Sequence, residues 1–178
     1  MLKKNFGFVT QDNSFYKDLT TEENIFFFGR LYGLREDYLR TVLPELLSLV
    51  DLYEARSVLA RNLSGGMQRR LDIACAIVHN PSVLILDEPT EDLDPILRRE
   101  LLTMIRNINK RGTTVIFTTH LLDEADYLCD EIAIISDGRI VMTGSPDELR
   151  SSYGVGDEIH LVVESGDYQF YSEKLRPF

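Results

Sequence analysis

Residues 83–88 read VLILDE, and this short stretch decides the fold class. A continuous aliphatic run such as Val83 to Leu86 is typical of a parallel strand that is covered on both faces. Two carboxylates, Asp87 and Glu88, follow where such a strand ends. Downstream of a helical pattern, residues 113–119 form a second β-prone stretch. Strand, helix and strand in this order predict an α/β layer.

Upstream of this strand, most of the chain has helical periodicity. Apolar residues recur at helical spacing over 21–34 and over 37–52, where Pro44 either weakens the second helix or marks its true start. A third helix is expected to begin at Ser64. We predict one partial domain over 1–178, made of a helical subdomain (15–80), a core portion (1–14 and 81–152) and a C-terminal appendix (153–178).

The C-terminal part reads as antiparallel. Residues 132–136 and 139–143 flank Asp137-Gly138, a strong hairpin signal. The sequence SPDE at 145–148 predicts a helix start with a capping box and a proline at the first helical position. A second small hairpin is expected over 157–163 and 167–171.

The composition excludes several classes of protein. The chain carries 19 basic and 29 acidic residues, a net charge of −10. This balance argues against a nucleic-acid partner, because phosphate backbones require a basic face. No aliphatic run is long enough to span a bilayer, and no apolar segment follows the basic start at 1–4, so neither a membrane span nor a signal peptide is expected. Cys75 and Cys129 are expected to be reduced thiols of a cytoplasmic protein.

Residues 63–71 read LSGGMQRRL and predict a phosphate contact at a helix start. Gly65 and Gly66 leave backbone N–H groups uncovered, and the Ser64 hydroxyl can cap the helix or contact a phosphate oxygen. A helix N-terminus carries about half a positive charge, which suits a γ-phosphate. The alternative is an ordinary helix cap after a loop.

The acids at the strand end are candidates for metal binding and catalysis. Asp87 is well placed to hold Mg²⁺, and Glu88 to polarise an attacking water as a general base. His120 follows the next strand, where it can hydrogen-bond a phosphate. Alternatively, Asp87 and Glu88 form an acidic turn that caps the strand, and His120 is a polar residue at a strand end.

Two further residues have weaker signals. Gln11 ends the first β-prone stretch, 6–10, and its amide can ligate Mg²⁺ or orient water. The alternative is a solvated loop glutamine. Asp94 directly precedes the helix that starts at Pro95, where helix capping is as good an explanation as a functional role.

Together, these motifs resemble the ATP-binding subunit of ABC transporters over essentially the whole chain. The resemblance matches Leu63–Met67 to the signature motif, Val83–Asp87 to Walker B, Glu88 to the catalytic glutamate, Gln11 to the Q-loop, Leu93-Asp94 to the D-loop, and His120 to the switch histidine. Residues 19–34 and Met67 look most like the exporter-type branch, which includes drug, polysaccharide and lipid exporters.

The resemblance implies a P-loop NTPase-like α/β domain with an inserted helical subdomain, and ATP and Mg²⁺ as cofactors. In the family, two subunits pair head to tail and sandwich two ATP molecules, and the signature serine and D-loop of one subunit complete the site of the other. It therefore implies two partners, a second ABC ATPase subunit and a transmembrane permease. The implied location is the cytoplasmic face of the cell membrane. The aromatic run Phe26 to Phe28 offers a surface for the permease or, alternatively, packs in the core.

The chain departs from the family pattern in two places. Glu91 and Asp92 stand where the D-loop usually has a small residue and glycine. The sequence also contains no GxxxxGK[ST], the loop that cradles nucleotide phosphates. We therefore expect an N-terminally truncated form with impaired ATP binding and an exposed hydrophobic sheet edge. The alternative is a non-catalytic module that donates the signature motif to a partner ATPase. A soluble ABC-type ATPase of DNA repair or translation fits the acidic charge less well.

Overall fold

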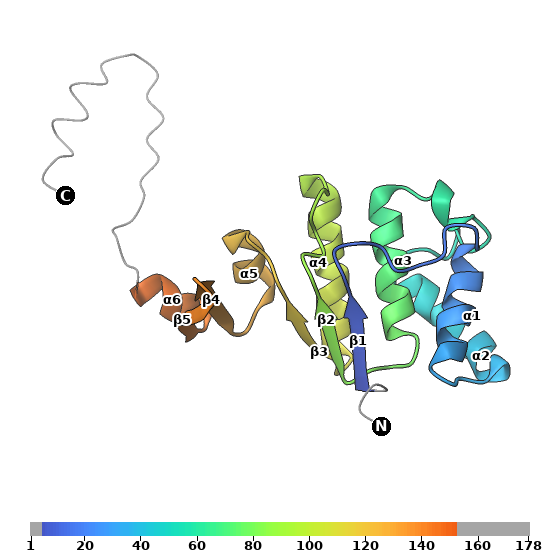
Figure 1. Cartoon of the computed structure of the whole chain (residues 1–178), viewed down its shortest axis with the longest axis horizontal. Coiled ribbons are helices and arrows are strands. Elements are labelled where there is room, and N and C mark those ends of the chain that lie inside the picture. The colour runs from blue at the N-terminus through green and yellow to red at the C-terminus, as the bar shows by residue number, and fades with distance from the viewer. Residues whose placement is uncertain (1–4, 153–178) are drawn as a thin grey trace, which may run out of the picture. The chain divides into compact units, whose positions relative to one another are not determined.

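The described residues, 5–152 of the computed structural model, form a parallel sheet with helices and a separate antiparallel hairpin (Figure 1). The chain divides after Asp130 into two compact units. The larger unit carries the sheet and five α-helices in its described part. The division into a helical subdomain and a core stays a prediction.

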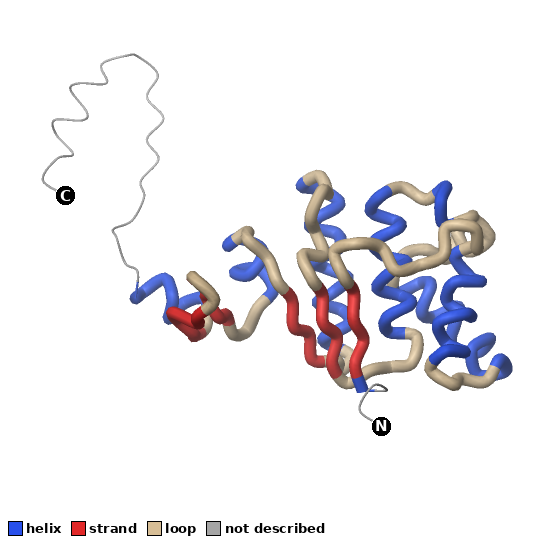
Figure 2. Tube along the Cα trace, in the orientation of Figure 1, coloured by secondary structure: helices blue, strands red, loops and turns tan. Residues whose placement is uncertain are grey.

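The sheet has three strands in the order β1-β2-β3, and all pair in parallel (Figure 2). They are β1 (Phe6–Val9), β2 (Val83–Leu86) and β3 (Thr114–Phe117). Val9 is in register with Leu86, and Leu86 is in register with Phe117. Because the strands are parallel, the residues that follow all three strands gather at one edge of the sheet.

Only one face of this sheet is covered by the described residues. Val9, Leu84 and Leu86 are 0% exposed and belong to the core, where α3 (Gly65–Ile77) contacts β1 and α4 (Pro95–Lys110) contacts β3. On the opposite face, Phe8 is 55% and Ile116 is 53% exposed. The prediction that β2 is covered on both faces is therefore wrong for this part of the chain, while the expected exposed hydrophobic edge stays a prediction.

The first two helices are shorter at their C-termini than the periodicity predicts. Helix α1 (Thr21–Leu31) starts with a Thr20–Glu23 capping box, and α2 (Glu36–Leu49) follows after a short turn. Gly33 and Asp51 have positive φ values of 80° and 55°, which end the helical path after each helix. Pro44 lies inside α2 rather than at its start.

Of the remaining helices of this unit, two contact the sheet and two pack against those helices. They are η2 (Ala60–Asn62), α3 (Gly65–Ile77), α4 (Pro95–Lys110) and α5 (Leu122–Leu128). Helix α3 is buried on nearly all sides and packs against both α1 and β1. Its approach to β1 is so close that a Cβ at Gly7 would lie 2.4 Å from the carbonyl oxygen of Ala76. Glycine is therefore required at position 7.

The second unit contains the predicted hairpin. Strands β4 (Ile132–Ser136) and β5 (Arg139–Gly144) pair antiparallel. Asp137 and Gly138 both have positive φ, 50° and 72°, as a two-residue type I′ turn requires. Helix α6 (Pro146–Ser152) starts with the predicted capping box, in which the Ser145 N–H donates to the Glu148 carboxylate and the Ser145 hydroxyl accepts the Glu148 N–H. The second predicted hairpin and the appendix lie outside the described residues.

Within residues 5–152, none of the helices has the length and apolar character that crossing a membrane requires. Both cysteines are free thiols, and Cys75 is buried.

Candidate functional site

The carboxyl edge of the sheet brings Asp87 together with a residue that the sequence analysis missed, Thr118. The Thr118 hydroxyl donates to Asp87 Oδ1 at 2.6 Å. The same hydroxyl accepts the N–H of Glu88 at 3.0 Å. Because Leu86 and Phe117 are in register, the residues that follow them meet side by side. The signal in the sequence was a hydroxyl two residues before His120.

The second acid pairs with the predicted histidine. His120 Nδ1 lies 3.1 Å from Glu88 Oε2, so the two side chains share a hydrogen bond. Glu88 has a φ of 41°, a left-handed conformation that non-glycine residues rarely adopt. Such strain is frequent at functional sites, where the surroundings enforce it. Asp87, Glu88, Thr118 and His120 thus form one cluster, which we call the carboxyl-edge cluster.

Gln11 lies in the first loop (residues 10–14, after β1), and its amide nitrogen has a hydrogen-bond partner. Its Nε2 donates to Glu91, in the second loop (residues 87–94, after β2). The N–H of Asp87 also donates to the carbonyl oxygen of Val9 at 2.9 Å. The structure therefore places Gln11 beside Glu91, one of the two acids that depart from the family pattern.

Arg69, on α3, is the second residue that the sequence analysis missed. It is buried and donates to backbone carbonyls of both loops. Desolvation lowers its pKa, while the nearby carboxylates of Asp72, Asp87 and Glu91 act in the opposite direction. Arg69 is part of the LSGGMQRRL motif, but the motif gave it no role, because the contacts of an arginine with backbone carbonyls depend on the fold.

Ser64, Gly65 and Gly66, which we call the signature turn, open α3. The Ser64 hydroxyl accepts the N–H of Met67 at 3.3 Å as the helix cap. A Cβ at Gly65 would have no neighbour within 4 Å, whereas one at Gly66 would approach Leu97 at 3.3 Å. In the described part of the chain, no hydrogen bond connects the signature turn with the carboxyl-edge cluster. The glycine at position 65 thus serves no packing need within the described residues.

Asp94 has the capping role that was one of its two predicted roles. Its Oδ1 accepts the N–H groups of Ile96 and Leu97 at 3.0 and 3.1 Å. Asp92, two residues earlier, has a φ of 61°. The family pattern has glycine at that place, and the backbone here keeps the conformation that favours glycine.

A groove of about 460 Å³ separates the two loops from the start of α3. Gln11, Gly65, Arg69, Glu91 and Asp92 are among the residues that line it. Three carboxylates, those of Asp12, Glu91 and Asp92, therefore face the same space as the N-terminus of α3.

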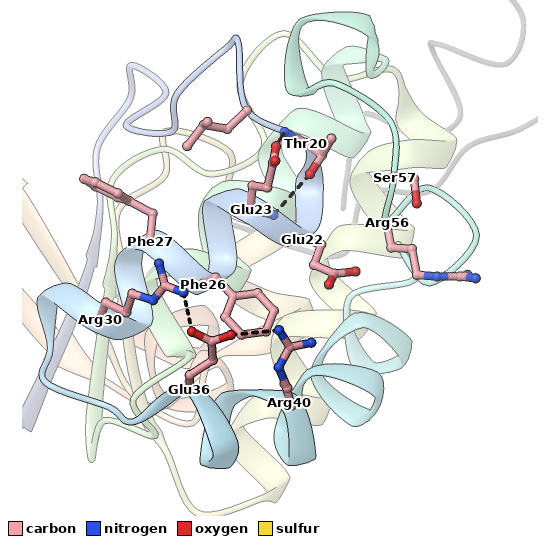
Figure 3. Close-up of a pocket in the computed structure, with 11 residues that line it drawn as sticks. Thr20, Glu22, Glu23, Phe26, Phe27, Arg30, Glu36, Arg40, Arg56 and Ser57 are labelled. Atoms are coloured by element: carbon pink, nitrogen blue, oxygen red, sulfur yellow. Dashed lines mark hydrogen bonds and ion pairs between the residues drawn. The ribbon is translucent and has the colours of Figure 1, made fainter.

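A second groove, of about 580 Å³, lies on the helical part between α1 and α2 (Figure 3). Phe26 and Phe27 line it, and both are partly buried, so these rings are divided between core and surface. Glu36 lies between Arg30 and Arg40 and binds each at 2.7 Å. Both guanidinium groups also lie over the Phe26 ring, at 5.9 and 5.5 Å from its centroid. The groove is thus lined by an aromatic ring and a paired set of charges.

The carboxyl-edge cluster and Gln11 together offer donors that suit a hard cation such as Mg²⁺. Asp87 offers a carboxylate and Gln11 an amide oxygen, and oxygen ligands are what Mg²⁺ prefers. The described residues contain no group of three or more His, Cys, Asp or Glu side chains that could hold a metal alone. Mg²⁺ sites in proteins usually combine one or two carboxylates with substrate phosphates and water.

Comparisons with known proteins agree with these motifs. The family described as ABC transporter matches residues 1–91. The linearmycin resistance ATP-binding protein LnrL of Bacillus subtilis is 38% identical over 174 residues, which cover 98% of this chain and 56% of that protein. The Nod factor export ATP-binding protein I of Sinorhizobium fredii is 40% identical over 149 residues, which cover 84% of this chain and 43% of that protein. The chain spans about half the length of these curated relatives.

Solved structures show the same relationship. The structure of cbiO1 from Clostridium perfringens, part of the ABC transporter complex cbiONQ, aligns with a TM-score of 0.79 and 30% identity over 86% of this chain and 62% of that one. An ATP binding subunit of an ABC transporter aligns with a TM-score of 0.71 and 28% identity, over 96% of this chain and 68% of that one. The chain therefore belongs to the ABC transporter family and forms part of its ATP-binding domain.

Proposed function

We propose that this chain is part of a subunit that hydrolyses ATP, in a pair of such subunits, to drive transport by a membrane permease. The observation that carries the proposal is the carboxyl-edge cluster, in which Asp87, Glu88, Thr118 and His120 are joined by hydrogen bonds. Membership of the ABC transporter family supports ATP as the nucleotide.

Each residue of the cluster has a role in this proposal. Glu88 accepts a proton from the attacking water as a general base. His120 holds the Glu88 carboxylate by their hydrogen bond and contacts the terminal phosphate. Asp87 and Gln11 would hold Mg²⁺, which neutralises charge on the phosphate oxygens. Thr118 fixes Asp87 and the backbone of Glu88 in place.

The signature turn serves the nucleotide of a second subunit. Its open glycine at position 65 and its uncovered helix N-terminus favour a close approach of a phosphate from outside the chain. Ser64, Gly65 and Gly66 would therefore complete the site of the second subunit, with Asp94 keeping the adjacent start of α4 in shape.

The groove between α1 and α2 is the proposed docking place for the permease. It combines partly exposed rings with a charged rim, as protein interfaces do. Contact with the permease would place the subunit on the cytoplasmic face of the cell membrane. The names of two relatives refer to linearmycin resistance and to Nod factor export, which supports an exported substrate.

A second candidate function is a module without catalysis that only lends the signature turn to a partner ATPase. Glu91 favours it, because it binds the amide nitrogen of Gln11, the predicted Mg²⁺ ligand, and adds a carboxylate beside the nucleotide. The intact pair of Glu88 and His120 favours the first function, since a pure donor requires neither residue.

The test mixes the chain with a complete ATP-binding subunit of the family whose own catalytic glutamate is intact. Both functions predict a gain in ATP hydrolysis, and Ser64→Arg should abolish it. Ser82→Arg is the matched control, because Ser82 is an exposed serine at the amino end of β2 and should leave the gain unchanged. No gain on mixing would reject both functions.

The catalytic residues separate the two functions. If this chain hydrolyses ATP in the mixed pair, Glu88→Gln in this chain lowers the turnover of the pair. If it only donates the signature turn, Glu88→Gln leaves turnover unchanged while Ser64→Arg still abolishes the gain.

A further inference from the structure

Arg69 is a buried cation whose hydrogen bonds go mainly to the backbone. It is 7% exposed, and its nearest carboxylate in the described structure, Asp72, lies 3.8 Å away. Removing a guanidinium from water costs several kcal/mol unless its N–H groups are bonded. Its partners therefore show what the residue is for.

These partners are five carbonyl oxygens from two loops. Nη1 donates to Thr10 at 2.6 Å and to Gln11 at 3.3 Å, both in the first loop. The second loop supplies three acceptors: Nη2 donates to Asp87 and Glu88, each at 3.0 Å, and Nε donates to Pro89 at 2.9 Å.

We propose that Arg69 is a positioning residue, which fixes the loop that carries Gln11 relative to the loop that carries Asp87 and Glu88. Its importance for hydrolysis rests on the function proposed above. The residue touches the backbone of the proposed Mg²⁺ ligands and of the proposed base, while its side chain takes no part in the chemistry.

The guanidinium group is necessary for this role. Its planar fork presents N–H groups in fixed directions, so one side chain can serve two loops at once. A lysine at this position would carry the same charge, but its three donors radiate from one nitrogen and cannot span the same set of carbonyls.

Helix α3 also connects this fork to the signature turn. Arg69 lies five residues after Ser64, or about 7.5 Å along the helix axis at the usual rise per residue. A displacement of α3 on contact with a second subunit would therefore move the carbonyls that Arg69 holds. In this way, α3 links the turn offered to the partner with the loops of the chain's own site.

Hydrogen exchange of backbone amides in the 178-residue chain, followed by NMR, tests the proposal. The amides of Glu88 and Glu91 report on the second loop, because they donate to Thr118 and to the carbonyl of Glu88. Arg69→Lys should raise their exchange rates about tenfold, the effect of losing one to two net hydrogen bonds. The amide of Ile105, in the buried core of α4, should be unaffected.

Arg70→Lys is the matched control. Arg70 is the next residue of α3, is 9% exposed and binds two carboxylates, those of Asp51 and Glu100. It contacts neither loop, so its substitution should leave Glu88 and Glu91 protected. If Arg70→Lys raised exchange at these two amides as much as Arg69→Lys, the positioning role would be wrong.

A rescue experiment separates positioning from general stability. In Arg69→Ala, millimolar guanidinium ion should restore protection at Glu88 and Glu91, because the ion refills the site with the same planar donors. Acceleration that includes Ile105, or that added guanidinium does not reverse, would assign Arg69 a structural role only and overturn the proposal.

A measurement on the native chain, without any variant, also tests the proposal. The Nε–H of Arg69 should exchange far more slowly than that of Arg35, whose guanidinium is exposed. Equal exchange would contradict the proposal. None of these measurements requires nucleotide or a second subunit, so they stand or fail independently of ATP hydrolysis.

Discussion

The hydroxyl of Thr118 joins the two acids of the site, because it donates to the carboxylate of Asp87 and accepts the N–H of Glu88. Replacing it with a methyl group removes both bonds and keeps the shape. We expect Thr118→Val to lower the free energy of unfolding by roughly 1–2 kcal/mol, since both partners have some access to water. Urea denaturation measures the change.

Thr118→Ser is the control for this prediction. It keeps the hydroxyl, so its free energy of unfolding should lie close to that of the native chain and above that of Thr118→Val. Equal stability of the valine variant and the native chain would mean that water replaces the hydroxyl without cost.

Gly7 supports a second prediction, because α3 lies directly against β1. A Cβ at this position would lie 2.4 Å from the Ala76 carbonyl oxygen, and backbone cannot rotate away as a side chain can. We expect Gly7→Ala to destabilise the fold by about 1–3 kcal/mol through overpacking. Gly65→Ala should be neutral or slightly stabilising, since no atom lies within 4 Å of its Cβ position. The midpoint of thermal unfolding should therefore fall clearly for Gly7→Ala and stay the same or rise slightly for Gly65→Ala.

The sequence predicted some features of the fold and of the candidate site and missed others. The alternation of strand and helix along the chain, and the position of the Asp87–Glu88 pair at the end of a strand, followed from apolar runs. The contacts of Thr118 and Arg69 did not, since they depend on the register of β2 with β3 and on the close approach of α3 to both loops. The coverage of β2 was predicted wrongly because a continuous apolar run does not show whether one face or two is packed.

Asp92 gives a third prediction. Its φ of 61° places a residue with a Cβ in the left-handed region, which costs about 1 kcal/mol relative to glycine. Asp92→Gly should therefore raise the free energy of unfolding by a few tenths to about 1 kcal/mol, although the greater freedom of the unfolded chain offsets part of the gain. Asp92→Ala is the control, because it keeps a Cβ at this φ and should therefore give no such gain in stability. A destabilising Asp92→Gly would show that the carboxylate itself holds the loop.

Nucleotide affinity provides a fourth prediction. The 178 residues contain no GxxxxGK[ST], and each charge-assisted hydrogen bond missing to the phosphates is worth on the order of 1.5–3 kcal/mol. We expect isothermal titration of this chain with MgATP to give a dissociation constant in the millimolar range or no detectable heat. Micromolar binding would contradict this, and would mean that the carboxyl-edge cluster and α3 hold the nucleotide alone.

The last prediction concerns the buried carboxyl of Asp72, which lies on α3 one turn after Arg69. The side chain is 2% exposed, and its Oδ1 accepts the N–H of Ser14 at 3.0 Å. Burial raises its pKa to about 6, against the smaller lowering effects of the Ser14 N–H and of Arg69. Burial raises the pKa of the Cys75 thiol well above its ordinary value, and the charge of Asp72 adds to this effect.

A raised carboxyl pKa has a definite effect on stability. Between about pH 4 and pH 6 the native chain holds a proton on Asp72 that the unfolded chain has lost, so stability from this group falls as the pH rises through that window. A shift of about two pKa units corresponds to roughly 3 kcal/mol, complete above the native pKa. Hydrogen bonds lower the pKa values of the exposed carboxyls of Glu23, Glu36 and Glu148. The stability that these three groups contribute is therefore lost as the pH falls, opposite to the effect of Asp72.

The comparison that isolates Asp72 is urea denaturation of the native chain and of Asp72→Asn at several pH values from 4 to 7. The three glutamates act equally in both proteins, so they cancel in the difference. The asparagine variant carries no titrating group at this position, and its stability relative to the native chain should rise steadily between about pH 4 and pH 6 and level off above. Parallel curves would show that Asp72 is ionised throughout, with its charge held by Arg69 across the whole range.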